Sequence, residues 1–263
     1  MIKTEIGQTT PERITVRGHD LVGELIGQID FVDMLMLVTV GRRCVGNEKD
    51  MINAILVTVT DHGLTPSALA ARLTFMGAPE APQAAVAAGL LGAGSVFLGA
   101  MQDAAMMLEE AGQGLDADSG DADIARAAKA FVTERRAARR PLHGLGHNIH
   151  IDGDPRVPVL RAVSERNGYF GRYWRLLLAV DAATGEVYSR RLRANTAGAV
   201  GAMILSMGVP VHLARGLALV GRCAGLIGHL IEDEHSPIGK DLWDLVLEQD
   251  DRNVLPAARA NRP

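Results

Sequence analysis

Cysteine is scarce in this chain of 263 residues: Cys44 and Cys223 are the only two, and they lie far apart. They form no CxxC pair and no His/Cys ligand set, which argues against a disulfide framework. We therefore expect a protein of the reducing cytoplasm. The first residues, Met1 to Gln8, contain no apolar stretch of the kind that a signal peptide needs, in agreement with that expectation.

An excess of positive charge is also missing: 27 Lys and Arg residues face 31 Asp and Glu residues, for a formal net charge of −4. No basic block indicates a nucleic acid or an anionic membrane as partner. No run of about 18 apolar residues is free of charges and turn residues, so we predict no membrane span.

Apolar residues, by contrast, make up 48% of the chain, and charged residues 22%. This composition leaves ample material for a core, and the length fits one large domain, alone or with a small appendage. Strand signals are few and short, with Ile14–Val16 as the clearest, whereas apolar residues recur at helical spacing elsewhere. The sequence therefore predicts an all-α protein whose buried helices meet at glycine-bearing junctions.

The expected helices have local start and stop signals. Gly63 suits the left-handed backbone after a helix, Thr65-Pro66 suits the start of the next helix, and Thr10–Glu12 resembles a further helix cap. A loop rich in Gly, Asp and Ser, 112–123, is the plausible hinge of a small subdomain at about 113–205. Helices are predicted over two segments within 21–40, broken near 29–30, and over 48–59, 67–77, 81–92, 96–111, 124–140, 157–167, 169–183, 195–207, 211–233 and 241–249.

Two of these helices, 81–92 and 195–207, are rich in small residues. Small side chains let helices approach closely, so both suit helix-on-helix contact between subunits. We therefore expect a homo-oligomer.

The segment from Pro141 to Arg156 is the clearest candidate for chemistry, because it sets His143, His147 and His150 among three glycines. Gly and Pro disfavour a helix here and predict a loop. Gly lets the backbone approach a ligand closely, whereas the alternative is a polar turn with surface histidines.

Two further residues are candidates. His62 lies at a junction between two buried helices, where a structural role is the alternative. Arg222 lies on an apolar helix, and a buried Arg requires an anionic partner. The basic cluster at Arg135–Arg140 either complements the dipole of its helix or attracts a phosphorylated ligand.

Three segments together resemble the citrate synthase family. Val59–Ser67, with Asp61-His62-Gly63, is similar to its first catalytic-histidine segment. Gly144-Leu145-Gly146-His147, with Asp154-Pro155-Arg156 ending nine residues on, is similar to its second, and Leu219–Leu230 is similar to its late arginine helix. The order and spacing match from about residue 20 to 245, and the short chain looks closest to small stand-alone citryl-CoA lyases and the citryl-CoA lyase part of ATP-citrate lyase.

The resemblance implies an all-α, citrate-synthase-like bundle, a large helical domain with a small helical subdomain, over residues 1–263. It implies that His62 stabilises the enolate oxygen of the acetyl-CoA thioester and that His147 handles the proton of the citryl hydroxyl. Arg156, Arg222 and Asn195 would bind substrate. Gly144, Leu145 and Gly146 would bind the coenzyme A part. Neutral His donates well to an oxyanion, and the Arg fork suits carboxylates.

The sequence departs from the family at three positions. The family's catalytic aspartate falls on Ala197, so that Asp61, Asp152, Asp154 or a water would have to replace it. Phe97 stands where citrate synthases carry a histidine, and the ATP-citrate lyase domain also has an aromatic there. Lys240 is the nearest basic residue to the arginine that citrate synthases donate across their dimer, and we do not transfer that role.

The favoured prediction is a carbon–carbon lyase that cleaves citryl-CoA, or a related 3-hydroxy-3-carboxyacyl-CoA, to acetyl-CoA and oxaloacetate or another 2-oxo acid. Condensation in the reverse direction, a non-catalytic protein that binds CoA thioesters, and thioester hydrolysis are the alternatives. A pure scaffold would have little reason to keep Arg156 and Arg222.

The expected partners are a CoA thioester and a di- or tricarboxylic acid, with coenzyme A as acyl carrier and no permanently bound cofactor. The two predicted catalytic histidines and Arg222 form no ligand set with carboxylates or Cys, so no metal is expected. His143 and His150 would flank the substrate-contacting groups or face solvent.

Overall fold

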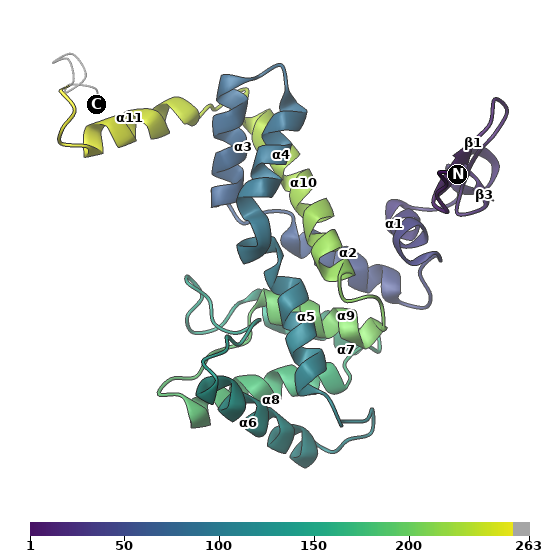
Figure 1. Cartoon of the computed structure of the whole chain (residues 1–263), viewed down its shortest axis with the longest axis vertical. Helices are drawn as coiled ribbons and strands as arrows, with labels where there is room; N and C mark the ends of the chain where they lie inside the picture. Colours follow the sequence, from purple (N-terminus) through teal and green to yellow (C-terminus); the bar gives the residue numbers. More distant parts are fainter. Residues whose placement is uncertain (255–263) are drawn as a thin grey trace. The chain divides into compact units, whose positions relative to one another are not determined.

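The computed structural model describes residues 1–254, which are mostly helical, and the predicted all-α class is confirmed (Figure 1). A small antiparallel sheet in the order β1-β2-β3 precedes the helices. It consists of β1 (Gly7–Thr9), β2 (Ile14–Val16) and β3 (His19–Asp20), with Gln8 opposite Thr15 and Thr15 opposite Asp20. The predicted extended segment Ile14–Val16 is therefore confirmed.

The predicted helix cap at Thr10–Glu12 is wrong. These residues form the turn between β1 and β2, where the amide of Thr10 donates to the carbonyl of Arg13 over 2.8 Å. The hydroxyl of Thr10 accepts from the amide of Arg13 over 3.0 Å. A Thr-Pro pair favours a turn as well as a helix start, and only the strand pairing distinguishes the two.

The helices begin and end close to the predicted positions. Thr65 caps α3, with Pro66 in its first turn, and Gly63 has the predicted left-handed backbone at φ +73°. The helical elements are the π-helical turns η1 (Leu21–Leu25) and η2 (Gly94–Leu98), and α1 (Phe31–Val40), α2 (Glu48–Val59), α3 (Pro66–Gly77), α4 (Pro82–Ala93), α5 (Ala100–Ala111), α6 (Asp121–Ala137), α7 (Arg156–Arg166), α8 (Arg172–Val187), α9 (Thr196–Met207), α10 (Leu213–Asp233) and α11 (Gly239–Gln249).

The chain divides into two compact units. Unit 1 contains Met1–Val59 and Ser95–Val220, and unit 2 contains Thr60–Gly94 and the chain from Gly221 on. The predicted subdomain at about 113–205 lies wholly inside unit 1 and does not follow this division, so it stays a prediction.

Unit 1 has its core where α5, α8 and α9 pack together, with α6 along α8 (Figure 1). Leu176, Leu177 and Met203 are fully buried there. Each such side chain contributes roughly 1.5–3 kcal/mol relative to an exposed one. At Gly201 a Cβ would lie 2.8 Å from the amide nitrogen of Ala105, so this glycine lets α9 approach α5 closely.

The small-residue helix 195–207 was expected to contact another subunit, and that expectation is wrong for most of its surface. Nine of the twelve residues of α9 are buried within the chain. Gly201 and its neighbours serve a contact inside unit 1. Composition indicates that something packs closely on such a helix, but it does not say whether the partner belongs to the same chain.

Unit 2 is built on α3, α4 and the part of α10 from Gly221 on. Its core holds Ala71, Phe75, Ala85, Leu226 and Leu230. Arg72 is buried as well, and it forms ion pairs with Asp233 at 3.3 Å and Glu232 at 2.9 Å. The pairing explains how a charged side chain is tolerated in this apolar unit.

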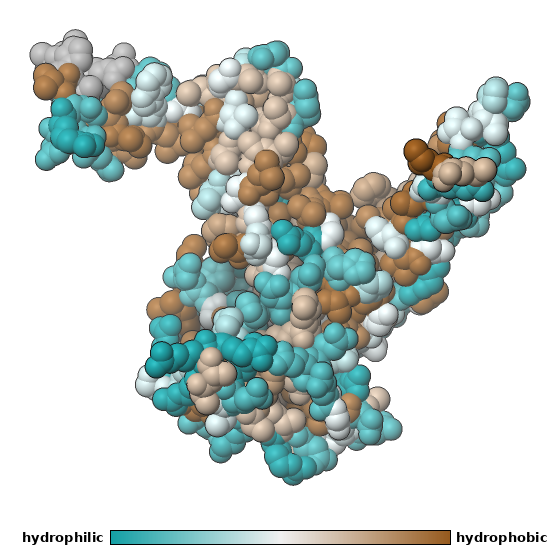
Figure 2. Space-filling model, in the orientation of Figure 1, coloured by the Kyte–Doolittle hydropathy of each residue, from teal (hydrophilic) through white to brown (hydrophobic). Residues whose placement is uncertain are grey.

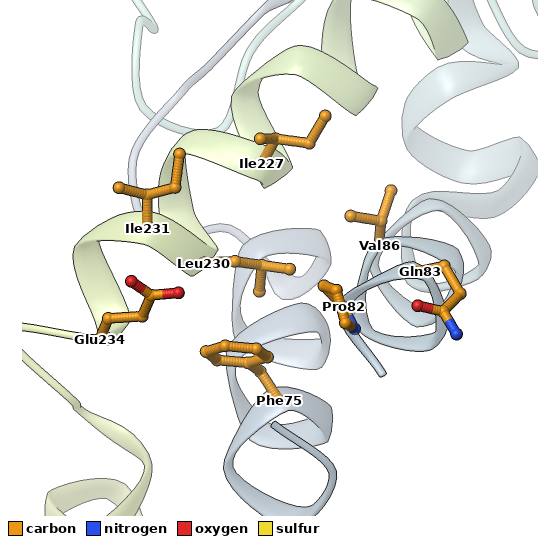
Figure 3. A pocket seen from close by; sticks show the side chains of 8 residues that line it. All are labelled: Phe75, Pro82, Gln83, Val86, Ile227, Leu230, Ile231 and Glu234. Carbon is orange, nitrogen blue, oxygen red and sulfur yellow. The ribbon is translucent and has the colours of Figure 1, made fainter. Parts of the chain in front are cut away.

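Apolar side chains also gather on the outside of unit 2, as Figure 2 shows for the face that it displays. They line a pocket of about 390 Å³ (Figure 3). Ile227 is 48% and Ile231 58% exposed at this pocket, and Trp243 on α11 is 60% exposed. The residues that line the pocket are Phe75, Pro82, Gln83, Val86, Ile227, Leu230, Ile231 and Glu234.

Two helical stretches, Pro82–Ala111 and Leu213–Asp233, are long and apolar enough to cross a membrane by length and composition. Within the apolar windows, 28% of the first and 33% of the second is buried. Core helices of proteins outside membranes pass the same test, which makes one or two such helices weak evidence. The expectation of no membrane span excluded these stretches because they contain charges and turn residues, and it stays a prediction.

Candidate active site

The predicted loop Pro141–Arg156 is confirmed up to Pro155, and Arg156 begins α7. The glycine-rich part of the loop is held against the segment before α9. The amide of Gly146 donates to the carbonyl of Arg193 over 2.7 Å, and the amide of Asn195 donates to the carbonyl of Gly144 over 3.0 Å. Leu145 and Ala194 form an isolated antiparallel bridge between these bonds. The backbone that leads into His147 is therefore fixed by main-chain hydrogen bonds.

Gly144 and Gly146 differ in how closely other atoms approach them. Both have left-handed backbone, with φ of +78° and +75°. A Cβ on Gly144 would lie 2.5 Å from the Cα of Gly198, whereas no atom of residues 1–254 beyond its chain neighbours lies within 4 Å of a Cβ on Gly146. Gly144 thus permits a backbone contact with α9, and Gly146 leaves open space beside the loop.

Asn195 caps α9. Its Oδ1 accepts from the amides of Ala197 and Gly198 over 2.9 and 3.2 Å, and its Nδ2 donates to the carbonyl of Gly146 over 2.5 Å. Both ends of the side-chain amide are engaged by the protein. Asn195 joins the loop to the helix, and its expected contact with substrate stays a prediction.

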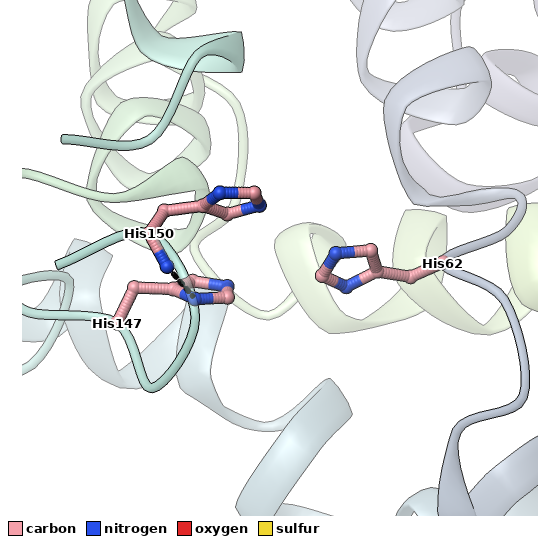
Figure 4. A group of neighbouring side chains, drawn as sticks. All are labelled: His62, His147 and His150. Atoms are coloured by element: carbon pink, nitrogen blue, oxygen red, sulfur yellow. Dashed lines mark hydrogen bonds between the residues drawn. The ribbon is translucent and has the colours of Figure 1, made fainter.

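His147 is held in one tautomer by the backbone that follows it. Its Nδ1 accepts from the amides of Ile149 over 3.0 Å and His150 over 3.1 Å, and Figure 4 shows the bond from His150. Because main-chain amides only donate, Nδ1 carries no proton, and the neutral ring carries its proton on Nε2. His150 also places its ring 4.6 Å from that of His147, so it belongs to the immediate surroundings of His147.

Asp154 is the centre of a buried hydrogen-bond network, and its side chain is 0% exposed. It accepts from Arg156 Nε and Nη2 over 2.9 and 2.8 Å, and from the amide and hydroxyl of Thr196 over 2.9 and 2.7 Å. Burial would raise the pKa of this carboxyl, but the hydrogen bonds from Arg156 and Thr196 outweigh it and hold the pKa well below its usual range. Asp154 is therefore a poor proton acceptor.

Arg156 is thus bound along one edge by Asp154. Its Nε and Nη2 groups face the Asp154 carboxylate, and its side chain is 29% exposed. The fork geometry fixes the plane of the guanidinium group. The orientation of Arg156 is fixed by this pairing, which suits the predicted contact with a carboxylate at its other edge.

In unit 2, His62 follows α2 in a turn shaped by its neighbours, and Figure 4 draws its side chain. Asp61 Oδ2 accepts from the amide of Gly63 over 2.7 Å, and Asp61 Oδ1 lies 2.8 Å from His229 Nε2. Arg222 Nη1 lies 3.9 Å from the same Oδ1. The Arg222 side chain is 12% exposed, and it therefore has an anionic neighbour in the protein, as its place on an apolar helix requires.

The pKa of Asp61 is also low. Burial would raise it, but hydrogen bonds from the Gly63 amide, from His229 and from the His62 amide together lower it. Ala197, in the first turn of α9, offers no carboxylate. Of the four candidates to replace the family aspartate, Asp61 and Asp154 are disfavoured as bases, which leaves the exposed Asp152 or a water.

The basic cluster has several structural partners. Arg135 is buried and forms a salt bridge with Glu110, which also binds Arg140 at 3.2 Å. Arg136 stacks over the ring of Tyr188 at 5.4 Å. Arg139 is exposed and has left-handed backbone. The sequence did not indicate these tertiary partners, and contact with a phosphate stays a prediction.

The structure adds Thr196 and His229 to the residues that sequence analysis singled out. Thr196 is separated from Asp154 by 42 residues, and His229 from Asp61 by 168. The only local signal for Thr196 was its place beside Asn195 at a helix start. His229 stood in the segment that resembles the arginine helix, but nothing in the sequence gave it a partner.

A family model described as citrate synthase, C-terminal domain, matches residues 13–240. The chain belongs to the citrate synthase family, and the predicted resemblance is confirmed.

Within that family, citryl-CoA lyase from Hydrogenobacter thermophilus is similar over 99% of both chains, with 28% identity and a TM-score of 0.82. ATP citrate lyase from Methanothrix soehngenii, solved with citrate and coenzyme A, matches with 21% identity and a TM-score of 0.74 over 100% of this chain and 43% of that one. Putative citrate synthase 2 of Mycobacterium tuberculosis is 29% identical over 191 residues, 70% of this chain. The chain spans about half, 48%, of the length of that relative.

Proposed function

We propose that the protein is a carbon–carbon lyase that cleaves citryl-CoA, or a related 3-hydroxy-3-carboxyacyl-CoA, to acetyl-CoA and oxaloacetate or another 2-oxo acid. The observation that carries the proposal is the match to a citryl-CoA lyase over 99% of both chains. The rigid presentation of His147 and Arg156 supports it, because a pre-organised site stabilises charge without having to rearrange.

The reaction needs three events that balance. The citryl hydroxyl would give its proton to a water or to the exposed Asp152, and the bond between the hydroxyl-bearing carbon and the methylene carbon breaks. The same water or carboxyl group would then return a proton to the methylene carbon, which becomes the acetyl methyl group. The bond's electron pair passes into the thioester as an enolate. His62 would donate a hydrogen bond to the enolate oxygen, and Arg156 and Arg222 would bind carboxylates.

The role of His147 follows from its tautomer. The neutral ring presents Nε2–H, because Nδ1 is occupied by two amides. A group that already carries a proton donates a hydrogen bond to the hydroxyl oxygen as it becomes a carbonyl, rather than removing its proton. We therefore assign His147 to stabilising that oxygen, which modifies the expectation that it takes the hydroxyl proton.

A second candidate function is supported by Ala197. Without a carboxylate there, and with Asp61 and Asp154 held at low pKa, the chain resembles a CoA-thioester-binding protein without turnover. Condensation in the synthase direction has the support of the relatives named citrate synthase. Both alternatives keep coenzyme A as acyl carrier.

We also propose that the protein forms a homo-oligomer in the cytoplasm. The exposed Leu91, Ile227 and Ile231 of unit 2 and the pocket of Figure 3 offer an apolar surface that a second copy would cover. Cys44 and Cys223 are unpaired thiols, as a reducing compartment permits. Light scattering after size exclusion measures the mass, and an Ile231→Glu variant is expected to shift it towards the monomer.

The deciding experiment mixes the purified protein with citryl-CoA and follows the CoA thioesters by mass spectrometry, with His147→Ala as control. Acetyl-CoA and oxaloacetate that form with the wild type and not with the variant would support the lyase. Citryl-CoA that persists and still raises the melting temperature would favour the binding protein.

A further inference from the structure

We infer that His229 is a positioning residue that fixes the His62 turn through the carboxylate of Asp61. The effect on catalysis rests on the proposed function, whereas the effect on the turn does not. All the groups involved belong to unit 2.

The turn that carries His62 packs directly on α10 at Gly225. A Cβ on Gly225 would lie 1.9 Å from the carbonyl oxygen of Thr60. This overlap with backbone has no side-chain remedy, so only a glycine lets Thr60 lie directly on the helix. Arg222 and His229 stand three residues before and four residues after Gly225, which places both on the same helix face as the turn.

Both carboxylate oxygens of Asp61 have hydrogen-bond partners. Asp61 Oδ1 pairs with His229 Nε2 over 2.8 Å, and Oδ2 accepts from the Gly63 amide over 2.7 Å. A carboxylate held at one oxygen by a side chain is fixed in rotation, so its other oxygen is aimed at the Gly63 amide. The left-handed backbone of Gly63, at φ +73°, closes the turn around His62.

The ring of His229 forms a hydrogen bond to Asp61 through one of its two nitrogens. Its side chain is 10% exposed, and its buried Nδ1 has no hydrogen-bond partner among residues 1–254. A buried polar atom without a partner has a cost, which the bond from Nε2 to Asp61 offsets. Asp61 is therefore the hydrogen-bond partner that fixes the ring of His229 in the described part of the chain.

The test replaces His229 in the full chain by Gln and by Asn, whose side-chain amides extend to different lengths. In His229→Gln the side-chain amide can occupy the place of Nε2, whereas in His229→Asn it is too short to reach Asp61. Hydrogen exchange at the Gly63 amide is measured by NMR without any ligand. We expect exchange about tenfold faster in His229→Asn and within about twofold of the wild type in His229→Gln.

The matched control is His235→Ala, which removes an exposed histidine just after α10. Circular dichroism checks that His229→Gln, His229→Asn and His235→Ala are folded. Equal exchange in His229→Asn, His229→Gln and His235→Ala would overturn the inference.

Kinetics with citryl-CoA add a second readout. We expect kcat to fall by about tenfold or more in His229→Asn, with KM within about twofold, and to recover in His229→Gln. If the wild type does not cleave citryl-CoA, the proposed function fails, and the exchange rates at Gly63 still decide the role of His229.

Discussion

Asp154 and Thr196, 42 residues apart in the chain, are joined by two hydrogen bonds, one from the amide and one from the hydroxyl of Thr196. Together with Arg156, they link the end of the His147 loop to the first turn of α9. This link has consequences for stability as well as for the site.

The first prediction concerns pH. The pKa of Asp154 is lowered from an ordinary value of 3.8, so its contribution to stability is present in full above that value and is lost as pH falls towards the folded-state pKa. The free energy of unfolding, measured in urea, should be larger for the wild type than for Asp154→Asn at pH 7. The difference should persist to about pH 5 and shrink below about pH 4. A difference that grows on acidification would contradict the assignment.

The second prediction concerns the tautomer of His147. Nitrogen-15 NMR at neutral pH should show a protonated Nε2 and an unprotonated Nδ1. If the lyase proposal holds, His147→Ala should lower kcat by about 10²–10³-fold, the usual cost of removing one donor to a developing oxyanion. His150→Ala is the matched control, because its amide donates to His147 and survives the substitution. A ring protonated on Nδ1 would exclude the proposed role.

The third prediction concerns Ala197, which lies in the first turn of α9. A carboxylate there interacts favourably with the helix dipole, so Ala197→Asp should fold with a stability change within about 1 kcal/mol. It should speed the exchange of the acetyl-CoA methyl hydrogens in D2O, followed by mass spectrometry, because a base is then available. Ala197→Asn supplies the same size without the base. Equal exchange in both variants would show that another group already does this work.

The fourth prediction compares two glycines of one loop. Gly144→Ala brings a Cβ to 2.5 Å from the Cα of Gly198, and Gly146→Ala meets open space at a similar φ. Gly146→Ala should cost about 1–2 kcal/mol for its left-handed backbone alone. Gly144→Ala should cost clearly more, because backbone atoms must also move apart. Urea denaturation of both variants measures the two costs, and equal losses would be inconsistent with the close contact.

Local signals predicted the helices well. The stop at Gly63 and the start at Thr65-Pro66 each depend on residues within one turn of the helix end. The loop from Pro141 on followed from its glycines in the same way. At Thr10 the local signal was ambiguous, and a strand partner decided the outcome.

The tertiary partners could not be predicted from one sequence. Asp61 was named as a possible replacement for the family aspartate, whereas it accepts from the Gly63 amide and its bond to His229 spans 168 residues. Arg135 was assigned to a helix dipole or a phosphate, whereas it pairs with Glu110 on α5. The small-residue helix α9 was placed at a surface because composition does not reveal which neighbour fills the space.

The ion pair between Arg156 and Asp154 gives the Asp-Pro-Arg motif a structural role. A pure scaffold was expected to have little reason to keep Arg156 and Arg222. Here Arg156 neutralises a buried carboxylate that also anchors Thr196. Arg156 therefore serves the fold whether or not the chain turns over a substrate. Asp-Pro-Arg alone is therefore no proof of catalysis, because the same triplet supports the fold.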